Sequence, residues 1–174
     1  MKYAPGYASN IGMIAGGTGI TPMLVRWPKF PPQRWCDAPD PGPGPDPIPF
    51  PASQQIIRAV LKNPSDRTGL SLIYANVNLD DILLKADLDR LAAEHADRFK
   101  VYYVLNNPPA SWDGGAGFVS TDMIRVHLPG PAKSNKVLLC GPPPMMGAMK
   151  KSLAELEFEA PNTISKMPDQ VFLF

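Results

Sequence analysis

Four short apolar runs constrain the fold of this chain more than any other feature of its sequence. They are "IGMIA" at residues 11–15, "LSLIYANV" at 70–77, "KVYYVL" at 100–105 and "KVLLC" at 136–140. The third run has no polar alternation, which is typical of a strand in a parallel sheet that helices cover on both faces. Segments with a helical pattern separate the runs. This alternation predicts an open, doubly wound, mostly parallel α/β sheet.

The helical segments and one further strand complete the predicted fold. In the second helix, Leu83, Leu84, Leu88 and Leu91 recur on one face. Residues 170–174 form a terminal edge strand, which brings the sheet to about five strands. The expected helices cover residues 21–24 continued by 55–62, 82–95, 121–127 and 145–156.

Length and composition limit the classes of function. A chain of 174 residues, 44% hydrophobic and 19% charged, can bury one good core as a single domain. A formal net charge of +1 and the lack of a Lys/Arg run give no general attraction to nucleic acid or anionic membrane. No apolar stretch reaches the roughly 18 residues of a spanning helix, and no secretory signal is present. We therefore expect a cytoplasmic location with Cys36 and Cys140 as free thiols.

Metal-dependent and hydrolytic chemistry are not expected. The two cysteines and the two histidines, His95 and His127, have unrelated spacings, so a zinc site is improbable. The sequence also offers no Ser-His-Asp or paired-carboxylate arrangement for hydrolysis.

The loop after the first run, "AGGTGITP", can approach a phosphate closely. Gly16, Gly17 and Gly19 lack a Cβ, so the backbone can turn sharply, and N–H groups at a helix start carry partial positive charge. Thr21 can cap the helix that follows, and Pro22 suits its first position. The loop lacks the full G-x-G-x-x-G spacing, so an unliganded tight turn is the alternative.

The loop after the fourth run, "LLCGPPPMM", joins a thiol, a glycine and three prolines that stiffen the entry to a helix. Six segments of the chain resemble the pyridine-nucleotide half of NADH:cytochrome b5 reductases, within the ferredoxin-NADP reductase superfamily. They are "GMIAGGTGITPML", "LIYANVNLDDILL", "FKVYYVLNNPP", "GGAGFV", "LLCGPPPMMGAMKKSL" and the terminal "DQVFLF". The resemblance covers the chain except residues 25–54.

The resemblance implies an NAD(H)-binding domain whose site is lined by both loops. In the family, NADH gives a hydride to FAD, and the reduced flavin passes electrons singly to a haem protein. Thr21 is implied to lie close to the flavin ring, and Cys140 beside the nicotinamide as a packing surface. A small buried strand residue is the plainer alternative for Cys140. The implied cofactor contacts are Gly16, Gly17, Thr18, Gly19, Thr21, Pro22, Cys140, Gly141, Pro142, Pro143 and Met145, with Thr21 and Cys140 as the catalytic pair.

Three further residues correspond to family positions. Asp81 is implied to lie near the adenine ribose, where a carboxylate accepts from the 2′-OH and repels a 2′-phosphate, which favours NADH over NADPH. Asp80 or Asp81 can instead cap the helix expected from Ile82, and both roles can hold at once. Tyr74 can flank the nicotinamide or simply fill the sheet. Phe174 matches a terminal aromatic near the flavin, or it is only the apolar end of an edge strand.

The family's flavin-binding barrel, which precedes this domain, has no counterpart in the 174 residues. We therefore expect this chain alone to hold no FAD. By resemblance, the electron acceptor is cytochrome b5 or a similar haem protein, and the parent enzymes are often anchored at the endoplasmic reticulum or the mitochondrial outer membrane. The alternative is a catalytically inactive nucleotide-binding fragment or a partner-binding module.

Residues 25–54 depart from the family pattern. They hold ten of the 22 prolines and interrupt the first helix, where an interior proline costs about 3 kcal/mol or more. We expect this insertion to loop out and to be disordered. One hypothesis is a retained intron translated in frame, since Val25 requires a GTN codon and Gln54 can be CAG. The other is a functional loop that binds SH3- or WW-type partners through polyproline II structure.

Overall fold

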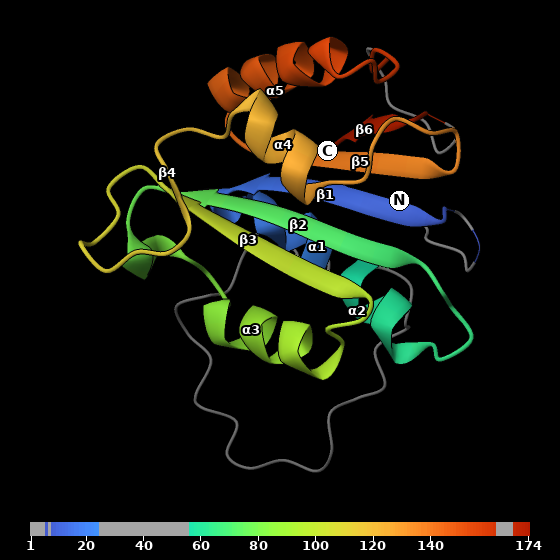
Figure 1. The fold of residues 1–174 in the computed structure, drawn as a ribbon, viewed down its shortest axis with the longest axis horizontal. Helices are drawn as coiled ribbons and strands as arrows, with labels where there is room; N and C mark the ends of the chain where they lie inside the picture. The colour runs from blue at the N-terminus through green and yellow to red at the C-terminus, as the bar shows by residue number, and fades with distance from the viewer. Residues whose placement is uncertain (1–5, 7, 25–55, 163–168) are drawn as a thin grey trace, which may run out of the picture.

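The computed structural model of this chain describes residues 6, 8–24, 56–162 and 169–174. Within these residues, one sheet of six parallel strands has the order β4-β3-β2-β1-β5-β6 (Figure 1). The strands are β1 (Asn10–Gly16), β2 (Gly69–Asn76), β3 (Phe99–Leu105), β4 (Gly115–Ala116), β5 (Asn135–Cys140) and β6 (Val171–Leu173).

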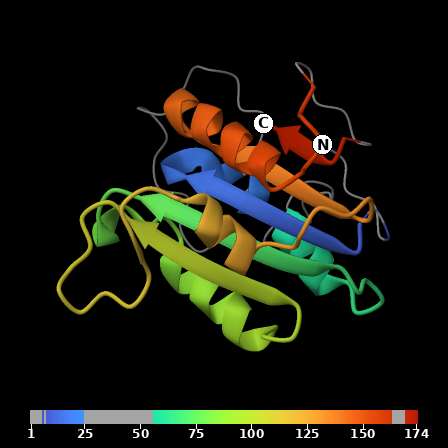
Figure 2. The same cartoon turned by 45° about the horizontal axis from the view of Figure 1, so that its top comes forward.

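Helices cover both faces of the sheet, as predicted. They are α1 (Thr21–Leu24), α2 (Ile56–Lys62), α3 (Lys85–Glu94), α4 (Thr121–His127) and α5 (Pro143–Glu155), together with the 3₁₀ helices η1 (Gly17–Ile20) and η2 (Leu79–Asp81). Helices α1, α2 and α3 lie on one face, and α4 and α5 lie on the other (Figures 1 and 2).

Two apolar layers hold the helices to the sheet. Met13 and Ile14 are neighbours on β1, and because successive strand residues point to opposite faces, each belongs to a different layer. Met13 packs in the layer that contains Ile57 of α2, and Ile14 packs in the layer that contains Ile124 of α4 and Leu153 of α5. Burial on both sides explains why this strand has an apolar run in place of polar alternation.

The five predicted strands are confirmed, each to within one residue at either end. The sixth strand, β4, was not predicted. Its two residues, Gly115 and Ala116, pair with Val104 and Leu105 of β3 and carry no local strand pattern of their own. The nearby Trp112 donates its indole N–H to the carbonyl oxygen of Gly115 at 2.9 Å, which closes the loop before β4.

The helix predicted over residues 82–95 is wrong at its start. Helix α3 begins at Lys85, and Leu84 before it has φ 57° and ψ 26°, a left-handed conformation that no α-helix continues through. A capping box between Asn78 and Asp81 closes η2 as a separate turn, so the residues ahead of Leu84 belong to a different element.

This later start also corrects the predicted apolar face of the second helix. Leu83 and Leu84 lie outside the helix and are 44% and 40% exposed. Leu88 and Leu91 lie within α3 and are buried in the first apolar layer, as predicted. The helical spacing was therefore correct only for the residues that follow the left-handed position.

Helix α4 has its predicted bounds, and α5 begins two residues earlier than predicted, at Pro143. The predicted insertion, residues 25–54, lies outside the described residues. The helices that flank it share one layer, because Met23 of α1 and Ile57 of α2 are both fully buried there. Across the described ranges, we find no helix with the length and apolar character that crossing a membrane requires.

Candidate functional site

The strand order reverses beside β1, which is where open α/β sheets bind their ligands. From β1 the sheet grows through β2 and β3 to β4 on one side, and β5 and β6 occupy the other side. The parallel register sets Ala15, near the end of β1, opposite Cys140 at the end of β5. The loops after β1 and β5 therefore leave the sheet side by side at its carboxyl edge.

The two loops touch each other, and glycines stand where they meet. A Cβ on Gly19 would overlap the carbonyl oxygen of Cys140 and would lie 2.6 Å from its carbonyl carbon. A Cβ on Gly16 would lie 2.5 Å from the sulfur of Met145. A Cβ on Gly141 would be 3.1 Å from the same sulfur. Gly16 and Gly19 thus allow the two loops to pack closely, whereas the absence of a Cβ on Gly141 leaves room for Met145 of the same segment.

The outer side of the glycine turn is open. Gly17 has φ 53°, in the left-handed region that favours glycine, and a Cβ built on it would meet no atom within 4 Å. Thr18 is exposed beside it. Thr21 donates its hydroxyl hydrogen to the carbonyl oxygen of Thr18 at 2.7 Å, so its side chain closes the turn from the side of α1. A small ligand can therefore reach Gly17 and Thr18 without displacing a side chain.

The loop after β5 presents an apolar wall. Its three prolines, Pro142, Pro143 and Pro144, are exposed and have no backbone N–H, so the start of α5 offers a phosphate fewer donors than an ordinary helix N-terminus. Cys140 is half-buried, and burial raises the pKa of its thiol. The neutral thiol suits a packing surface and does not suit a nucleophile. This wall can accept a flat, uncharged ring, and Met145 lies between it and the glycine turn.

Tyr74 lies beneath the glycine turn and not on the surface. Its side chain is wholly buried, and its hydroxyl donates a hydrogen bond of 2.9 Å to the carbonyl oxygen of Gly17. The ring fills the sheet, which is the plainer of the two predicted roles, and only the hydroxyl reaches the turn. A direct contact between this ring and a nicotinamide stays a prediction.

Asp81 is exposed at the same edge, after β2. Its Oδ2 accepts hydrogen bonds of 2.9 Å from both the backbone N–H and the side-chain amide of Asn78. The prediction that Asp80 or Asp81 caps a helix beginning at Ile82 is therefore wrong, because no helix begins there. The Asp81 carboxylate instead takes part in the capping box of η2. The carboxylate keeps solvent access, so the capping role leaves it able to accept from a ribose hydroxyl as well.

Of the last two predicted residues, the structure describes the side chain of Phe174 but not that of Pro22. Phe174 follows β6 next to the end of β5, donates its backbone N–H to the carbonyl oxygen of Leu139 at 3.1 Å, and is 43% exposed. Its ring meets that of Phe172 edge to face, with 5.1 Å between the centroids. Phe174 thus offers an exposed aromatic surface at the carboxyl edge. The side chain of Pro22 lies outside what the structure describes.

Sequence reasoning missed three side chains that share this edge with Asp81, namely Asn78, Asn107 and Phe118. Asn107, after β3, donates its side-chain amide to that of Asn78 at 3.2 Å and its backbone N–H to the carbonyl oxygen of Val77 at 2.9 Å. Phe118 follows β4 and is 83% exposed, although it is aromatic. The text "GGAGFV" contains this residue, but only the pairing of β4 with β3 shows that it lies at the carboxyl edge.

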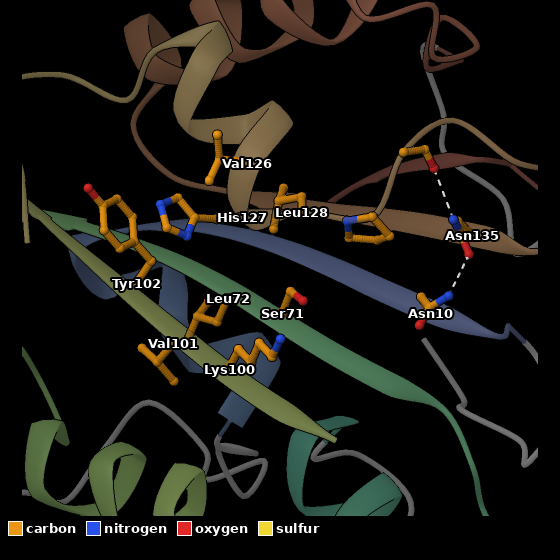
Figure 3. Close-up of a pocket in the computed structure, with 12 residues that line it drawn as sticks. Asn10, Ser71, Leu72, Lys100, Val101, Tyr102, Val126, His127, Leu128 and Asn135 are labelled. Carbon is orange, nitrogen blue, oxygen red and sulfur yellow. Dashed lines mark hydrogen bonds between the residues drawn. The ribbon is translucent and has the colours of Figure 1, made fainter. Parts of the chain in front are cut away.

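A separate cavity of about 550 Å³ lies away from all these residues. It opens between the end of α4 and the strands β2 and β3, and none of the predicted site residues lines it (Figure 3). In it the ring of Tyr102 stacks on that of His127, with 3.6 Å between the centroids, and burial lowers the pKa of His127. Among the described residues, no group of three metal-binding side chains is present.

Comparison with known proteins fits this geometry. The sequence profile of the family "Oxidoreductase NAD-binding domain" matches residues 51–151. NADH-cytochrome b5 reductase 1 of Laccaria bicolor is 49% identical over 174 residues, which cover 99% of this chain and 47% of that protein. NADH-cytochrome b5 reductase 1 of Mortierella alpina is 49% identical over 173 residues, which cover 99% of this chain and 48% of that protein. The chain thus spans about half the length of the curated relatives it matches.

A solved structure shows the same arrangement. The cytochrome b5 reductase domain of Ulva prolifera nitrate reductase superposes with a TM-score of 0.72 at 32% sequence identity. The superposition covers 96% of this chain and 50% of that chain. The similarity in sequence and fold therefore extends over nearly the whole of this chain.

Proposed function

Because the chain belongs to the family of oxidoreductase NAD-binding domains, we propose that it binds NADH and forms the nucleotide-binding half of a reductase of the NADH–cytochrome b5 reductase type. The contact between the glycine turn and the loop after β5, at the point where strand order reverses, carries this proposal. Two loops that touch at this position form one continuous surface on which an extended dinucleotide can lie.

The glycine turn receives the pyrophosphate. Gly17 has open space around its Cα and Thr18 is exposed, so phosphate oxygens can reach the backbone N–H groups of the turn. The loop after β5 has prolines at Pro142 and Pro143 and therefore contributes packing more than hydrogen bonds. This difference orients the ligand, with its charged part on the first loop and its flat ring against the second.

The nicotinamide lies against Cys140 and the residues that follow it. Bound NADH supplies a hydride, which a flavin accepts. The chain's own contribution is to hold the ring against a neutral thiol and an apolar wall that exclude water. Thr21, whose hydroxyl is held by the carbonyl oxygen of Thr18, lies beside this position and faces the flavin in this proposal.

The adenosine half extends over the loops after β2, β3 and β4. Asp81 accepts a hydrogen bond from the ribose 2′-OH and repels a 2′-phosphate, so the site selects NADH over NADPH. Phe118 offers an exposed ring on which the adenine can stack. Asn78 and Asn107 join the loops after β2 and β3 and so hold the Asp81 part of this surface in place.

Binding of the flavin and of the final electron acceptor is proposed for the whole reductase and not for this chain alone. FAD is held by the other half of such a reductase, near Phe174 and Thr21, and the acceptor is cytochrome b5 or a similar haem protein. Anchoring at the endoplasmic reticulum or the mitochondrial outer membrane is proposed for the parent enzyme alone.

Calorimetric titration of the purified chain with NADH and with NADPH tests the proposal. We expect saturable binding of NADH with a micromolar dissociation constant and weaker binding of NADPH. A titration of the variant Gly147→Ala, which adds a Cβ in open space on α5, is the matched control and should give the wild-type constant. A correctly folded wild-type chain that binds neither nucleotide would exclude the proposed site.

A further inference from the structure

We propose that the cavity at the end of α4 is a binding site for a small carboxylate with a flat, apolar body, and that it is independent of the proposed NADH site. Its volume of about 550 Å³ is within the range of cavities that hold small ligands in proteins. It lies near the residues at which β1, β2 and β3 begin, whereas the glycine turn follows the end of β1.

The sheet leaves room for this cavity because one row of its residues is small or polar. The parallel register places Gly12 of β1 beside Ser71 of β2, and Ser71 beside Lys100 of β3. The next residues along the first two strands, Met13 and Leu72, are buried in the layer against α2. Because successive strand residues point to opposite faces, the row points toward α4 and α5. It gives those helices little apolar surface to cover.

Helix α4 ends where this row begins. Its last residue is His127, whose ring stacks on that of Tyr102 with 3.6 Å between the centroids. After the helix, the chain packs over Gly12, where an added Cβ would lie 3.1 Å from the Cδ of Pro129. Figure 3 shows the end of α4 on one side of the cavity and the row of small and polar residues on the other.

Two hydrogen-bonded asparagines close the cavity where β1 and β5 begin. Asn10 donates its side-chain amide to the side-chain oxygen of Asn135 at 3.0 Å (Figure 3). Asn135 donates its own amide to the carbonyl oxygen of Gly130 at 2.9 Å. These bonds tie the segment after α4 to the first strand. The wall is therefore formed before a ligand binds, and binding does not have to order it.

The charge of the lining favours an anion. Lys100 is exposed, and among the described residues its ammonium group takes part in no ion pair. None of the described residues that line the cavity is Asp or Glu. Ser71, beside Lys100, adds a hydroxyl donor. A carboxylate can therefore accept a charge-assisted hydrogen bond from the lysine and a second bond from the serine.

The side formed by α4 suits a flat, apolar body. It consists of the stacked rings of Tyr102 and His127 together with Leu128, and Val126 stands beside it with 73% of its side chain exposed. Burial lowers the pKa of His127, so its ring is neutral at physiological pH. Lys100 is then the one cation among the described lining residues, and it matches the single charge of a carboxylate better than the double charge of a phosphate monoester.

Titration of the purified chain with benzoate, followed by NMR of the backbone amides, tests the proposal. We expect saturable shifts at residues 71, 100, 102 and 127–130, with a dissociation constant in about the millimolar range. Benzamide has nearly the same shape without the charge and should bind about tenfold more weakly or worse. Acetate keeps the charge without the ring and should bind about fivefold more weakly.

The variant Lys100→Met removes the charge and keeps an unbranched apolar side chain. We expect it to weaken benzoate binding by about tenfold or more and to leave NADH binding and the melting temperature as in the wild type. Lys62→Met is the matched control, because Lys62 is an exposed lysine at the end of α2, on the other face of the sheet (Figure 1). It should bind benzoate as the wild type does.

Several results would overturn this site. They are the lack of saturable shifts, shifts confined to residues 16–19, equal affinity for benzoate and benzamide, and wild-type benzoate binding by Lys100→Met. Inorganic phosphate that binds more tightly than benzoate would overturn the assignment to a carboxylate. If Lys100→Met fails to fold, the comparison of benzoate with benzamide on the wild type decides. A chain that binds NADH but not benzoate overturns this site alone, and one that binds benzoate but not NADH overturns the proposed function alone.

Discussion

Replacement of Gly19 by alanine should damage both the stability of the chain and its affinity for NADH. The added Cβ would lie 2.6 Å from the carbonyl carbon of Cys140 and 3.1 Å from the backbone nitrogen of Gly141. Both neighbours are backbone atoms at the end of a central strand, so no side-chain rotation can relieve the contact. The φ angle of Gly19 is not in the left-handed region, so the whole effect comes from the lost space.

The size of the effect follows from the distance by which the loops must separate. Ordinary van der Waals contact begins at 3.4 Å, so the turn must move away from Cys140 by at least 0.8 Å, the difference between 3.4 and 2.6 Å. Overpacking of this kind costs about 1–3 kcal/mol. For a chain of this length, that lowers the melting temperature by about 2–12 °C. A displacement close to 1 Å between the two halves of a binding surface should weaken NADH binding by about tenfold or more.

Thermal unfolding followed by circular dichroism and calorimetric titration with NADH measure the two effects of Gly19→Ala. Gly147→Ala is the control: it adds the same methyl group at an exposed position of α5, where an alanine stabilises a helix by roughly 0.5–1 kcal/mol. Its melting temperature should be equal to that of the wild type or higher. If Gly19→Ala melts and binds NADH as the wild type does, the two loops are not packed as described, and the proposed site loses its basis.

Three further predictions concern single groups. Asp81→Asn should weaken NADH binding by about three- to tenfold and reduce the preference over NADPH, as compared by parallel titrations; an unchanged ratio would show that Asp81 does not face the ribose. Burial lowers the pKa of His127, so the folded chain binds that proton less readily than the unfolded chain, and stability should fall as the pH drops through 6.5. The difference between urea midpoints at about pH 5 and pH 8 should therefore shrink in His127→Gln, and an equal difference would contradict this assignment. Because burial raises the pKa of Cys140, its thiol in the Cys36→Ser variant should react with a disulfide reagent more slowly than free cysteine and still more slowly with NADH present; reaction at the rate of free cysteine would contradict the burial of Cys140.

The strands could be predicted from the sequence because burial on both faces produces a run of consecutive apolar residues within each strand. Residues such as Met13 and Ile14 are apolar in succession because each faces a different helical layer, and that pattern is visible without a structure. The side-by-side placement of the two loops was predictable for a related reason, since parallel strands bring the loops after Gly16 and Cys140 to the same edge.

Other features depend on contacts between distant parts of the chain, so no pattern among neighbouring residues predicts them. The left-handed Leu84, which delays α3, lies within a run of leucines that reads as helix. Strand β4 exists only through its pairing with β3. The bond from Tyr74 to Gly17 could not be predicted, because the alternation of a strand shows which face a side chain occupies but not which carbonyl group its hydroxyl reaches.

The central position of β1 in the sheet affects the order in which parts of this chain can fold during synthesis. Its first residue, Asn10, pairs with Asn135, which is 125 positions further along the chain. A ribosome must therefore synthesise most of the polypeptide before β1 can pair with β5. Until then the glycine turn cannot pack against the loop that follows β5. A nascent chain released before that point would contain the glycine turn without the loop after β5 that packs against it, and its exposed strand edge would be open to chaperones and to proteolysis.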